Sequence, residues 1–355
     1  MVASKDMPPR TESFGSMFIK NQFRTKIPIL TRKEKDLDGR VAIITGASSG
    51  LGFECSKQLL SLGLSRLIMA VRSPERGEAI ASKLRFDHPE AVIDVWPLEM
   101  GSYQSIQDFV NRCESQLSQV NTVILNAGVS PSKFTKSSST GHEMGVQVNY
   151  LSTVLLVLLL VPMLKAKSPM SGTPARITIV TSIMATLAKF PNRKERPLLP
   201  SFDKIAATPF DPGETYMVSK LLGQLFLVKL ASEYVKPEYV VINMVDPGFV
   251  KGTGLQRQMG SAVRAALSVF KAVAARSVEK GAATYIDAAV IKGRESHGSL
   301  LINCEIAPLT DIAYASEGKT ITDQLWEETL DEFDFVNPRS ILAHIRDVQQ
   351  LQPQA

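Results

Sequence analysis

The stretch VAIITGASSGLG, residues 41–52, decides the fold. Its first four residues are apolar, as expected of a parallel strand that is covered on both faces of a sheet. Glycines follow at positions 46, 50 and 52, and a helix-like sequence continues to Leu62. A strand that leads through a glycine-rich turn into a helix forms an anion site, because free N–H groups and the helix dipole face the ligand. We therefore predict a dinucleotide-binding turn here.

The composition indicates a soluble globular protein with one large core. The chain has 355 residues, of which 44% are hydrophobic and 21% charged, and no Pro/Gly/Ser-rich linker divides it. Its net charge of +5 includes no long basic run, which argues against nucleic-acid binding. Cys55, Cys113 and Cys304 match neither a disulfide framework nor a zinc pattern, and the four histidines are scattered. We predict a reducing, cytoplasmic location and no metal.

The most apolar run is LSTVLLVLLLVPML, residues 151–164. It is too short to span a bilayer and contains Pro162, so we predict a buried helix and no membrane span. Residues 1–20 mix charges with prolines and lack the apolar core of a signal peptide.

The predicted organisation is one dinucleotide-binding domain with two extensions. We expect a leader at 1–38, the nucleotide-binding domain at 39–310, and a C-terminal helical extension at 311–355. Within the domain, residues 187–215 form a proline- and charge-rich insert, and residues 250–275 have the amphipathic, glycine-punctuated character of a lid. The leader is expected to pack on the core through Phe18, Phe23, Ile27 and Leu30.

Strand-like segments alternate with helical ones along the chain. After the first strand we predict strands at 66–71, 91–98, 120–125, 176–181, 240–245 and 299–302. This alternation predicts an α/β fold, a Rossmann-like doubly wound parallel sheet flanked by helices, with its ligand crevice at the carboxyl ends of the strands. Asn126, Ser182 and Asp246 each follow a predicted strand, so they converge on that crevice.

Residues after the second, third and fourth strands bear on the choice of cofactor. The second strand ends without an acid and Arg72 follows at once, which favours the 2′-phosphate of NADP(H) over a free ribose. Glu99 could accept a hydrogen bond from the adenine amino group, or could be an ordinary acid before a helix. Asn126, Ala127 and Gly128 are small enough for the cofactor to lie against the backbone.

Four further residues suggest proton chemistry. Tyr216 and Lys220 are four residues apart in a predicted helix and share one face. A neighbouring ammonium stabilises phenolate and lowers the phenol pKa toward neutrality. Ser182 can donate a hydrogen bond to an oxygen on which negative charge develops. Asn149 could hold a helix bend and a water that passes protons to Lys220.

The ordered set of motifs resembles that of the short-chain dehydrogenase/reductase family over residues 38–305. The resemblance implies a catalytic tetrad of Asn149, Ser182, Tyr216 and Lys220. It also implies cofactor contacts from Gly46, Ser48, Ser49, Gly50, Leu51, Gly52, Arg72, Glu99, Asn126, Ala127, Gly128, Tyr216, Lys220, Pro247, Gly248 and Val250. The leader and the long insert look like those of fungal members from secondary-metabolite pathways.

Several positions depart from the family pattern. Tyr216 lies 34 residues after Ser182, far more than in compact members, and the insert at 187–215 accounts for the difference. Leu125 stands where many members have an additional Asn, and Glu99 replaces a more usual Asp. One extra residue precedes Thr253 after the Pro247-Gly248 pair.

The sequence predicts an NADP(H)-dependent oxidoreductase that interconverts a carbonyl and an alcohol on a bulky apolar small molecule. Apolar residues of the predicted lid, Leu255, Val263, Leu267 and Phe270, motivate that choice of substrate. One alternative is a non-catalytic dinucleotide-binding or regulatory protein, against which the complete tetrad argues. Another is an epimerase or dehydratase that uses the same residues, which no sequence feature excludes. The helices at 151–161 and around Tyr216 pair in family dimers, so a homodimer is open, although the insertions could block it.

Overall fold

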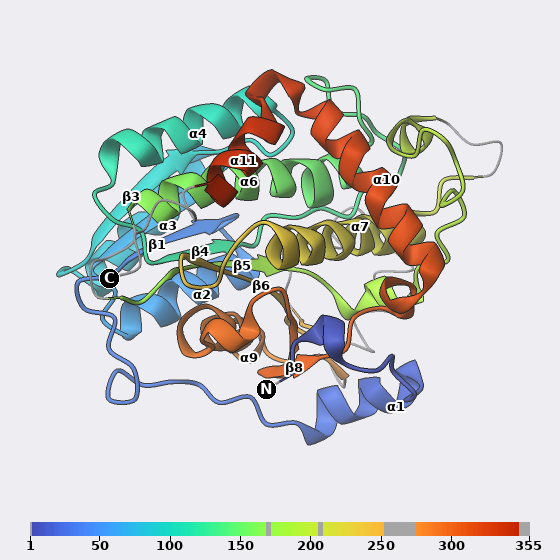
Figure 1. Cartoon of the computed structure of the whole chain (residues 1–355). Helices are drawn as coiled ribbons and strands as arrows, with labels where there is room; N and C mark the ends of the chain where they lie inside the picture. The colour runs from blue at the N-terminus through green and yellow to red at the C-terminus, as the bar shows by residue number, and fades with distance from the viewer. Residues whose placement is uncertain (1, 168–171, 205–208, 252–273, 348–355) are drawn as a thin grey trace, which may run out of the picture.

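An eight-stranded sheet forms the centre of the protein (Figure 1). The computed structural model describes residues 2–167, 172–204, 209–251 and 274–347. The strands run in the order β3-β2-β1-β4-β5-β6-β7-β8, and all neighbouring pairs are parallel except β7 and β8. The chain builds outward from β1 in one direction and then from β4 in the other, which opens a crevice between these two strands. The predicted Rossmann-like, doubly wound α/β fold with flanking helices is confirmed.

The ends of β1 to β7 agree with the predicted strand ends to within two residues, and β8 is an additional strand. The strands are β1 Val41–Thr45, β2 Arg66–Val71, β3 Val92–Pro97, β4 Thr122–Leu125, β5 Ala175–Val180, β6 Val240–Asp246, β7 Leu300–Ile302 and β8 Glu305–Ala307. Every residue of β1, β4 and β6 is buried, as expected of central strands covered on both faces.

The antiparallel strand β8 is not among the predicted strands. Asn303 and Cys304 form the two-residue turn that joins it to β7, with φ angles of +54° and +66°. Two successive positive φ angles are typical of a tight hairpin, for which Asn-Gly is the usual sequence signal. Here cysteine occupies the second position of the turn, so the signal is absent. The strand β8 itself has only three residues, which are too few to show an alternating pattern.

Helices cover both faces of the sheet. The α-helices are α1 Phe14–Ile19, α2 Gly50–Ser61, α3 Pro74–Asp87, α4 Tyr103–Gln116, α5 Met144–Val146, α6 Ser152–Ala166, α7 Pro212–Glu233, α9 Val278–Ile286, α10 Ser316–Glu332 and α11 Pro338–Asp347. Short 3-10 and π-helical segments are η1 Ser4–Asp6, η2 Lys20–Arg24, η3 Gln147–Leu151, η4 Ile183–Leu187, η5 Leu199–Asp203, η7 Asp287–Ile291, η8 Arg294–Ser296, η9 Asp311–Tyr314 and η10 Asp334–Val336. Buried side chains of α4, α6 and α7 form one apolar cluster, and those of α2, α3 and α9 form the other.

The apolar run becomes the predicted core helix. Residues Met144–Ala166 form one helix that is long and apolar enough to cross a membrane, but 89% of its most apolar window is buried inside the protein. The helix begins at Met144, because Glu143 caps it by accepting a hydrogen bond from the backbone N–H of Val146.

The C-terminal helices pack on the outer side of the core helices. In Figure 1, α10 runs across α7 while α11 lies over α6, and both pairs are in contact. Trp326 of α10 stacks on Phe226 and Tyr234, with ring centroids 4.5 and 4.7 Å apart. Trp326 is therefore part of the packing face between α10 and α7.

The leader is more ordered than the sequence indicates. It contains η1, α1 and η2, and the hydroxyl of Ser4 accepts a hydrogen bond from Leu300 N–H at 2.9 Å. Phe18, Ile27 and Leu30 pack on the protein as predicted. Phe23 does not, because it is 55% exposed. Phe18 and Gln22 are four residues apart and both contact Phe249, so the face of this segment that carries Phe23 is left to solvent.

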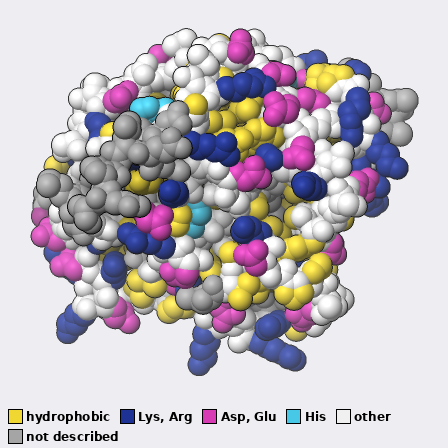
Figure 2. All heavy atoms as spheres, in the orientation of Figure 1, with side chains coloured by type: hydrophobic (Ala, Val, Ile, Leu, Met, Phe, Trp, Pro, Cys, Tyr) yellow, Lys and Arg dark blue, Asp and Glu magenta, His cyan; other side chains and the backbone are white. Residues whose placement is uncertain are grey.

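The surface carries mixed charge. Figure 2 shows Lys and Arg side chains interspersed with Asp and Glu over the face drawn, as expected from 40 basic and 35 acidic residues. Such mixing favours solubility.

Candidate active site

The glycine-rich turn between β1 and α2 has the backbone that an approaching phosphate needs. Gly46 and Gly50 have φ angles of +66° and +58°, which side chains other than glycine rarely tolerate. A Cβ atom on Gly52 would lie 2.5 Å from the carbonyl oxygen of Gly46. Each of the three glycines is therefore required by the shape of the turn. Ser49 precedes α2 with its hydroxyl unused as a cap, so α2 begins with its first N–H groups uncapped by that side chain.

Thr45 and Asn126 join the ends of β1 and β4 beneath this turn. The Asn126 Nδ2 donates to the carbonyl oxygens of Thr45 and Gly46 at 2.9 and 3.3 Å. In return, the Thr45 hydroxyl accepts from the backbone N–H groups of Asn126 and Ala127 at 3.0 and 2.9 Å. The sequence prediction includes Asn126 but misses Thr45, whose hydroxyl at the end of an otherwise apolar strand is the available signal.

The predicted cofactor residues Arg72 and Glu99 lie next to each other. The side chain of Arg72 is 75% exposed directly after β2, and its Nε lies 3.9 Å from Glu99 Oε2. The other carboxylate oxygen of Glu99 accepts a hydrogen bond from Gly101 N–H at 2.9 Å. Glu99 thus shapes the turn before α4 while one of its oxygens faces the arginine. The guanidinium remains accessible from solvent.

Ser182 and Tyr216 come together despite the 34 residues between them. Ser182 lies two residues after the end of β5, and Tyr216 lies in the second turn of α7. Burial raises the pKa of Tyr216 to about 12, a hydrogen bond with the Ser182 side chain opposes this shift, and the charge of Asp246 adds to it. Desolvation outweighs the neighbouring groups, so the phenol pKa is raised and not lowered as the sequence predicts.

Lys220 lies on the face of α7 that Tyr216 occupies, four residues further on. Its side chain is 8% exposed, and its Nζ lies 6.0 Å from the centroid of the Tyr216 ring. The Nζ donates a hydrogen bond to the carbonyl oxygen of Val180 at 2.9 Å. Burial lowers the pKa of Lys220 to about 8. At neutral pH Lys220 is therefore mostly protonated, and its pKa is close to the ambient pH.

Asn149 lies in the π-helical segment η3 that joins α5 to α6, which matches the helix bend predicted for it. Its Oδ1 accepts from Val129 N–H, and its Nδ2 donates to Val129 O and Ser219 Oγ, each at 2.9 Å. A Cβ atom on Gly128 would lie 3.2 Å from Asn149 Oδ1 and 3.6 Å from Lys220 Nζ. Gly128 thus lets Asn149 and Lys220 approach the same stretch of backbone.

A cavity of about 10 Å³ lies behind Lys220, and Asn149 and Gln224 also line it. Such a volume holds about one water molecule when polar groups line the cavity. Gln224 Nε2 donates to Thr181 Oγ1 at 3.1 Å, while its buried Oε1 has no hydrogen-bond partner among the residues that the structure describes. Gln224 is a polar residue on the catalytic face of α7 that the sequence prediction misses.

The Pro247-Gly248 turn is fixed by Asp246, the last residue of β6. Asp246 Oδ1 accepts from Ile183 N–H and Oδ2 accepts from Gly248 N–H, both at 2.9 Å. Gly248 has a φ angle of +77°, which favours glycine. One buried carboxylate therefore holds the segment after Ser182 and the turn after β6 together. The same turn continues to Val250, which forms an isolated bridge with Arg276.

The leader reaches this turn through Gln22, which the sequence prediction does not include. Gln22 Nε2 donates to the carbonyl oxygens of Phe249 and Ala274, both at 2.8 Å, and its Oε1 accepts from Phe249 N–H at 3.2 Å. Arg276 adds hydrogen bonds to Pro247 O, Asn21 O and Asn303 Oδ1. Most of the predicted lid, residues 252–273, lies outside the described residues.

The insert predicted at 187–215 packs against the C-terminal extension. The carboxylate of Glu328 in α10 accepts hydrogen bonds from the backbone N–H groups of Leu198 and Leu199 at 2.8 and 2.7 Å. Phe190 and Leu198 are buried. The insert includes the last residue of η4 and the first four residues of α7, so it connects the segment after Ser182 to the helix that carries Tyr216. Among the described residues, no group of three or more His, Cys, Asp or Glu is placed to hold a metal.

Comparisons with known proteins agree with this architecture. Residues 40–193 match the short chain dehydrogenase family model. The short chain dehydrogenase/reductase mfmJ of Annulohypoxylon moriforme is 50% identical over 347 residues, covering 98% of this chain and 99% of the relative. The short chain dehydrogenase virL of Hypocrea virens is 40% identical over 333 residues, covering 93% and 94%. The solved structure of a Pseudomonas aeruginosa RhlG/NADP active-site complex has a TM-score of 0.56 at 21% identity, with coverage of 79% and 98%. The chain belongs to the short-chain dehydrogenase/reductase family of oxidoreductases.

Proposed function

We propose that the protein is an NADP(H)-dependent oxidoreductase that interconverts a carbonyl and an alcohol on a bulky apolar small molecule. The observation that carries the proposal is the convergence of Ser182, Tyr216 and Lys220 beside the carboxyl end of β5. Carbonyl reduction needs a phenol, a hydroxyl donor and a buried ammonium, and here all three lie at the carboxyl ends of the strands of a dinucleotide-binding fold.

The glycine-rich turn fits a dinucleotide, because Gly46 and Gly50 adopt positive φ angles and α2 begins with N–H groups that the Ser49 side chain does not cap. Gly46, Gly50 and Gly52 would hold the pyrophosphate. The other proposed cofactor contacts are Ser48, Ser49, Leu51, Arg72, Glu99, Asn126, Ala127, Gly128, Tyr216, Lys220, Pro247, Gly248 and Val250. When bound, NADP(H) supplies or accepts the hydride.

The exposed guanidinium of Arg72 supports NADP(H) over NAD(H). A planar guanidinium can donate paired hydrogen bonds to a phosphate. Its single carboxylate neighbour, Glu99, lies 3.9 Å away at the surface, and such exposed pairs contribute little free energy. A ligand phosphate can therefore compete with that pair. The RhlG structure named above, which is a complex with NADP, supports the same choice by analogy of fold.

Tyr216 is the proposed proton donor in the direction of reduction. Its Oη would pass a proton to the substrate oxygen while the Ser182 hydroxyl donates a hydrogen bond to that oxygen as negative charge develops. Lys220 would favour the resulting phenolate by charge. A water in the cavity beside Asn149 and Gln224 could return the proton through Lys220. Asn149 itself holds the backbone at Val129 and positions Ser219, next to the lysine.

The proposed apolar substrate is supported by the surface next to Ser182. Met184 and Leu187 in η4 are 37% and 39% exposed close to Ser182, so apolar side chains are available there to contact a substrate. The lid residues that motivate this substrate in the sequence lie outside the described residues. Because the relatives named above are fungal proteins, we propose a cytoplasmic role in secondary-metabolite biosynthesis.

The test is consumption of NADPH with a panel of bulky apolar ketones, with wild type and Tyr216→Phe compared. We expect the variant to lose at least about 100-fold in kcat, the usual contribution of a general acid. Tyr314→Phe is the matched control, because it removes a hydroxyl that donates to Ser4 O at 2.6 Å, outside the site. Retained activity in Tyr216→Phe would overturn the assignment. An isomerised product formed without net NADPH consumption would favour the epimerase alternative instead.

A further inference from the structure

A second pocket lies at the amino ends of the strands, at the opposite edge of the sheet from the cofactor crevice. It has a volume of about 220 Å³. Arg40 directly precedes β1, Asn121 directly precedes β4, and Arg176 is the second residue of β5, so three strand starts contribute to one pocket. Lys35 enters from the leader, and η7 closes the remaining side with Val290. No residue of the proposed active site lines it.

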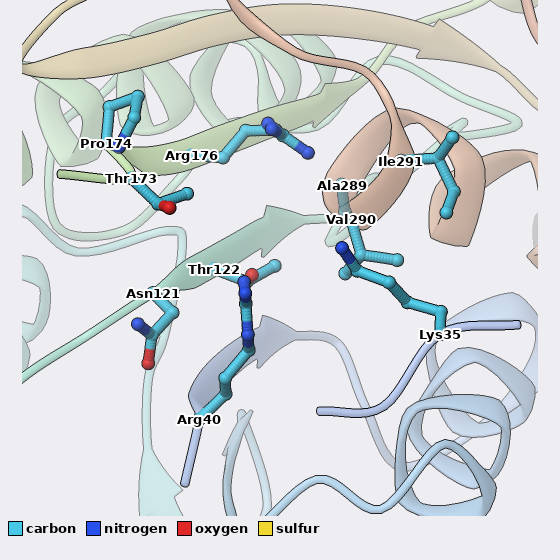
Figure 3. A pocket seen from close by; sticks show the side chains of 10 residues that line it. All are labelled: Lys35, Arg40, Asn121, Thr122, Thr173, Pro174, Arg176, Ala289, Val290 and Ile291. Atoms are coloured by element: carbon cyan, nitrogen blue, oxygen red, sulfur yellow. The ribbon is translucent and has the colours of Figure 1, made fainter. Parts of the chain in front are cut away.

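Three cationic side chains face this pocket. Figure 3 shows Lys35, Arg40 and Arg176 entering from three different segments, with their nitrogen atoms directed toward the space between them. Arg176 is only 8% exposed, and its buried Nε has no hydrogen-bond partner among the residues described. Within the described parts of the chain, none of the three forms an ion pair. A buried guanidinium nitrogen without a partner is costly, and an anion bound in the pocket would supply one.

The nearest acids do not neutralise these charges directly. Asp287 pairs with Lys292 at 3.4 Å, and Glu295 Oε1 accepts a hydrogen bond from Gly293 N–H at 2.8 Å. Burial lowers the pKa of Arg176 to about 10, with Asp287 and Glu295 acting against that shift from a distance. Burial, together with repulsion from Arg40 and Arg176, lowers the pKa of Lys35 as well. The cations therefore repel one another in the absence of an anion.

We propose that this pocket binds a small oxyanion of the phosphate class, either free phosphate or a phosphate monoester. Two guanidinium groups and an ammonium offer donors that match phosphate oxygens, and the planar guanidinium suits paired contacts. Asn121 Oδ1 is already occupied by Val41 N–H at 2.8 Å, so its amide nitrogen is the atom left to donate. The volume exceeds the roughly 30 Å³ of one water molecule several-fold, which leaves room for a phosphate.

The test is the increase in Tm that inorganic phosphate produces, compared with sodium chloride at equal ionic strength. A ligand that binds only the folded protein raises its stability by mass action. We expect phosphate to raise the Tm of wild type, and Lys35→Met and Arg40→Gln each to weaken phosphate binding by about tenfold or more, because each removes a charged hydrogen bond. Lys33→Met is the matched control, since it removes an exposed charge two residues from Lys35 and should bind phosphate as wild type does.

The cofactor crevice is the competing site for phosphate, so the titration is repeated with Arg72→Ala and with NADPH present at saturation. The proposal requires phosphate binding to persist in both. It is overturned if phosphate stabilises no more than chloride does, or if Arg72→Ala loses the effect while Lys35→Met keeps it. Phenyl phosphate then separates the two sources. If phenyl phosphate binds at least as tightly as inorganic phosphate, the natural ligand is a phosphate monoester. If phenyl phosphate is excluded from the pocket, the natural ligand is the free ion.

Discussion

The Nζ of Lys220 donates a hydrogen bond to the carbonyl oxygen of Val180 at 2.9 Å, and this contact ties α7 to the carboxyl end of β5. Ser182 lies two residues beyond Val180, so one contact sets the position of the buried ammonium relative to the serine. The sheet and the helix thereby fix the three proposed catalytic side chains without relying on a flexible loop.

Replacing this lysine should separate activity from stability. Burial of the ammonium lowers the pKa of Lys220 to about 8, so folding disfavours its charged form. The unfolded chain binds the proton of Lys220 more tightly than the folded protein does. The contribution of this group to stability therefore rises with pH between about 8, its pKa in the folded protein, and 10.5, its ordinary pKa. We expect Lys220→Met to lose about 100-fold or more in kcat/KM while its Tm at neutral pH stays near that of wild type.

The measurement is kcat/KM and Tm on the same preparation, with Lys229→Met as control. Lys229 lies on α7 but pairs with Asp323 at 2.7 Å, away from the site. Retained activity in Lys220→Met would contradict the proposed role. A collapse of its Tm would contradict the energetic argument.

Gln22 should act as a positioning residue for the turn after β6. Its three hydrogen bonds to Phe249 and Ala274 fix backbone that continues from Pro247 and Gly248. We expect Gln22→Ala to weaken NADPH binding several-fold, because each hydrogen bond contributes about 1 kcal/mol to holding this turn. A fluorescence titration measures the effect, with Gln104→Ala as control because Gln104 is exposed on α4. Unchanged NADPH affinity would show that the leader has no influence on the cofactor site.

His142 should make stability dependent on pH. Its burial alone lowers its pKa, but hydrogen bonds to Asp203 at 2.7 Å and Glu332 at 3.0 Å prevail and raise the pKa from 6.5 to about 9. The folded protein therefore binds this proton more tightly than the unfolded chain. The stabilisation is fully present below about pH 6.5 and is lost as pH rises through about 9. Its size is on the order of 3 kcal/mol.

Urea unfolding of wild type and His142→Gln over this pH range tests the expectation. The difference in unfolding free energy between the two proteins should shrink as the pH rises through about 9. A difference that is constant with pH would mean that His142 does not carry the charge in the folded state. His142 also links two distant segments, because it contacts Asp203 in the insert and Glu332 at the end of α10.

The protein should be a monomer in solution. The sequence leaves open a homodimer through the helices at 151–161 and around Tyr216, and also its obstruction by insertions. In the structure, α11 packs on α6 and α10 packs on α7, so both helices are already covered within one chain. We expect light scattering after size exclusion to give the mass of one chain, 38.8 kDa. A dimer mass that persists on dilution would contradict this expectation.

Local motifs made the sheet and most of the site predictable. The strand, glycine turn and helix at residues 41–62 lie in one continuous stretch, and the other site residues follow strands whose order the α/β pattern dictates. The resulting family assignment is confirmed by the 50% identical relative. The structure also brings Asn149, Ser182, Tyr216 and Lys220 together, although their catalytic roles stay predictions.

Contacts between distant segments were not predictable. Gln22 and Phe249 are 227 residues apart, and no periodicity links a leader glutamine to a loop carbonyl. The basic pocket has the same origin, since Lys35, Arg40 and Arg176 become neighbours only when β1 and β5 take their places in the sheet. The phenol pKa is a third case, because its desolvation depends on packing around Tyr216 that helical spacing does not reveal.

The central claim is that the crevice binds NADP(H) through the glycine turn and Arg72. The most direct measurement is a fluorescence titration of wild type, Arg72→Ala and the control Lys83→Ala with NADPH and NADH. We predict that wild type binds NADPH more tightly than NADH, that Arg72→Ala loses about tenfold or more for NADPH alone, and that Lys83→Ala behaves as wild type. Failure of both nucleotides to bind wild type, or tighter binding of NADH than of NADPH, would contradict the account.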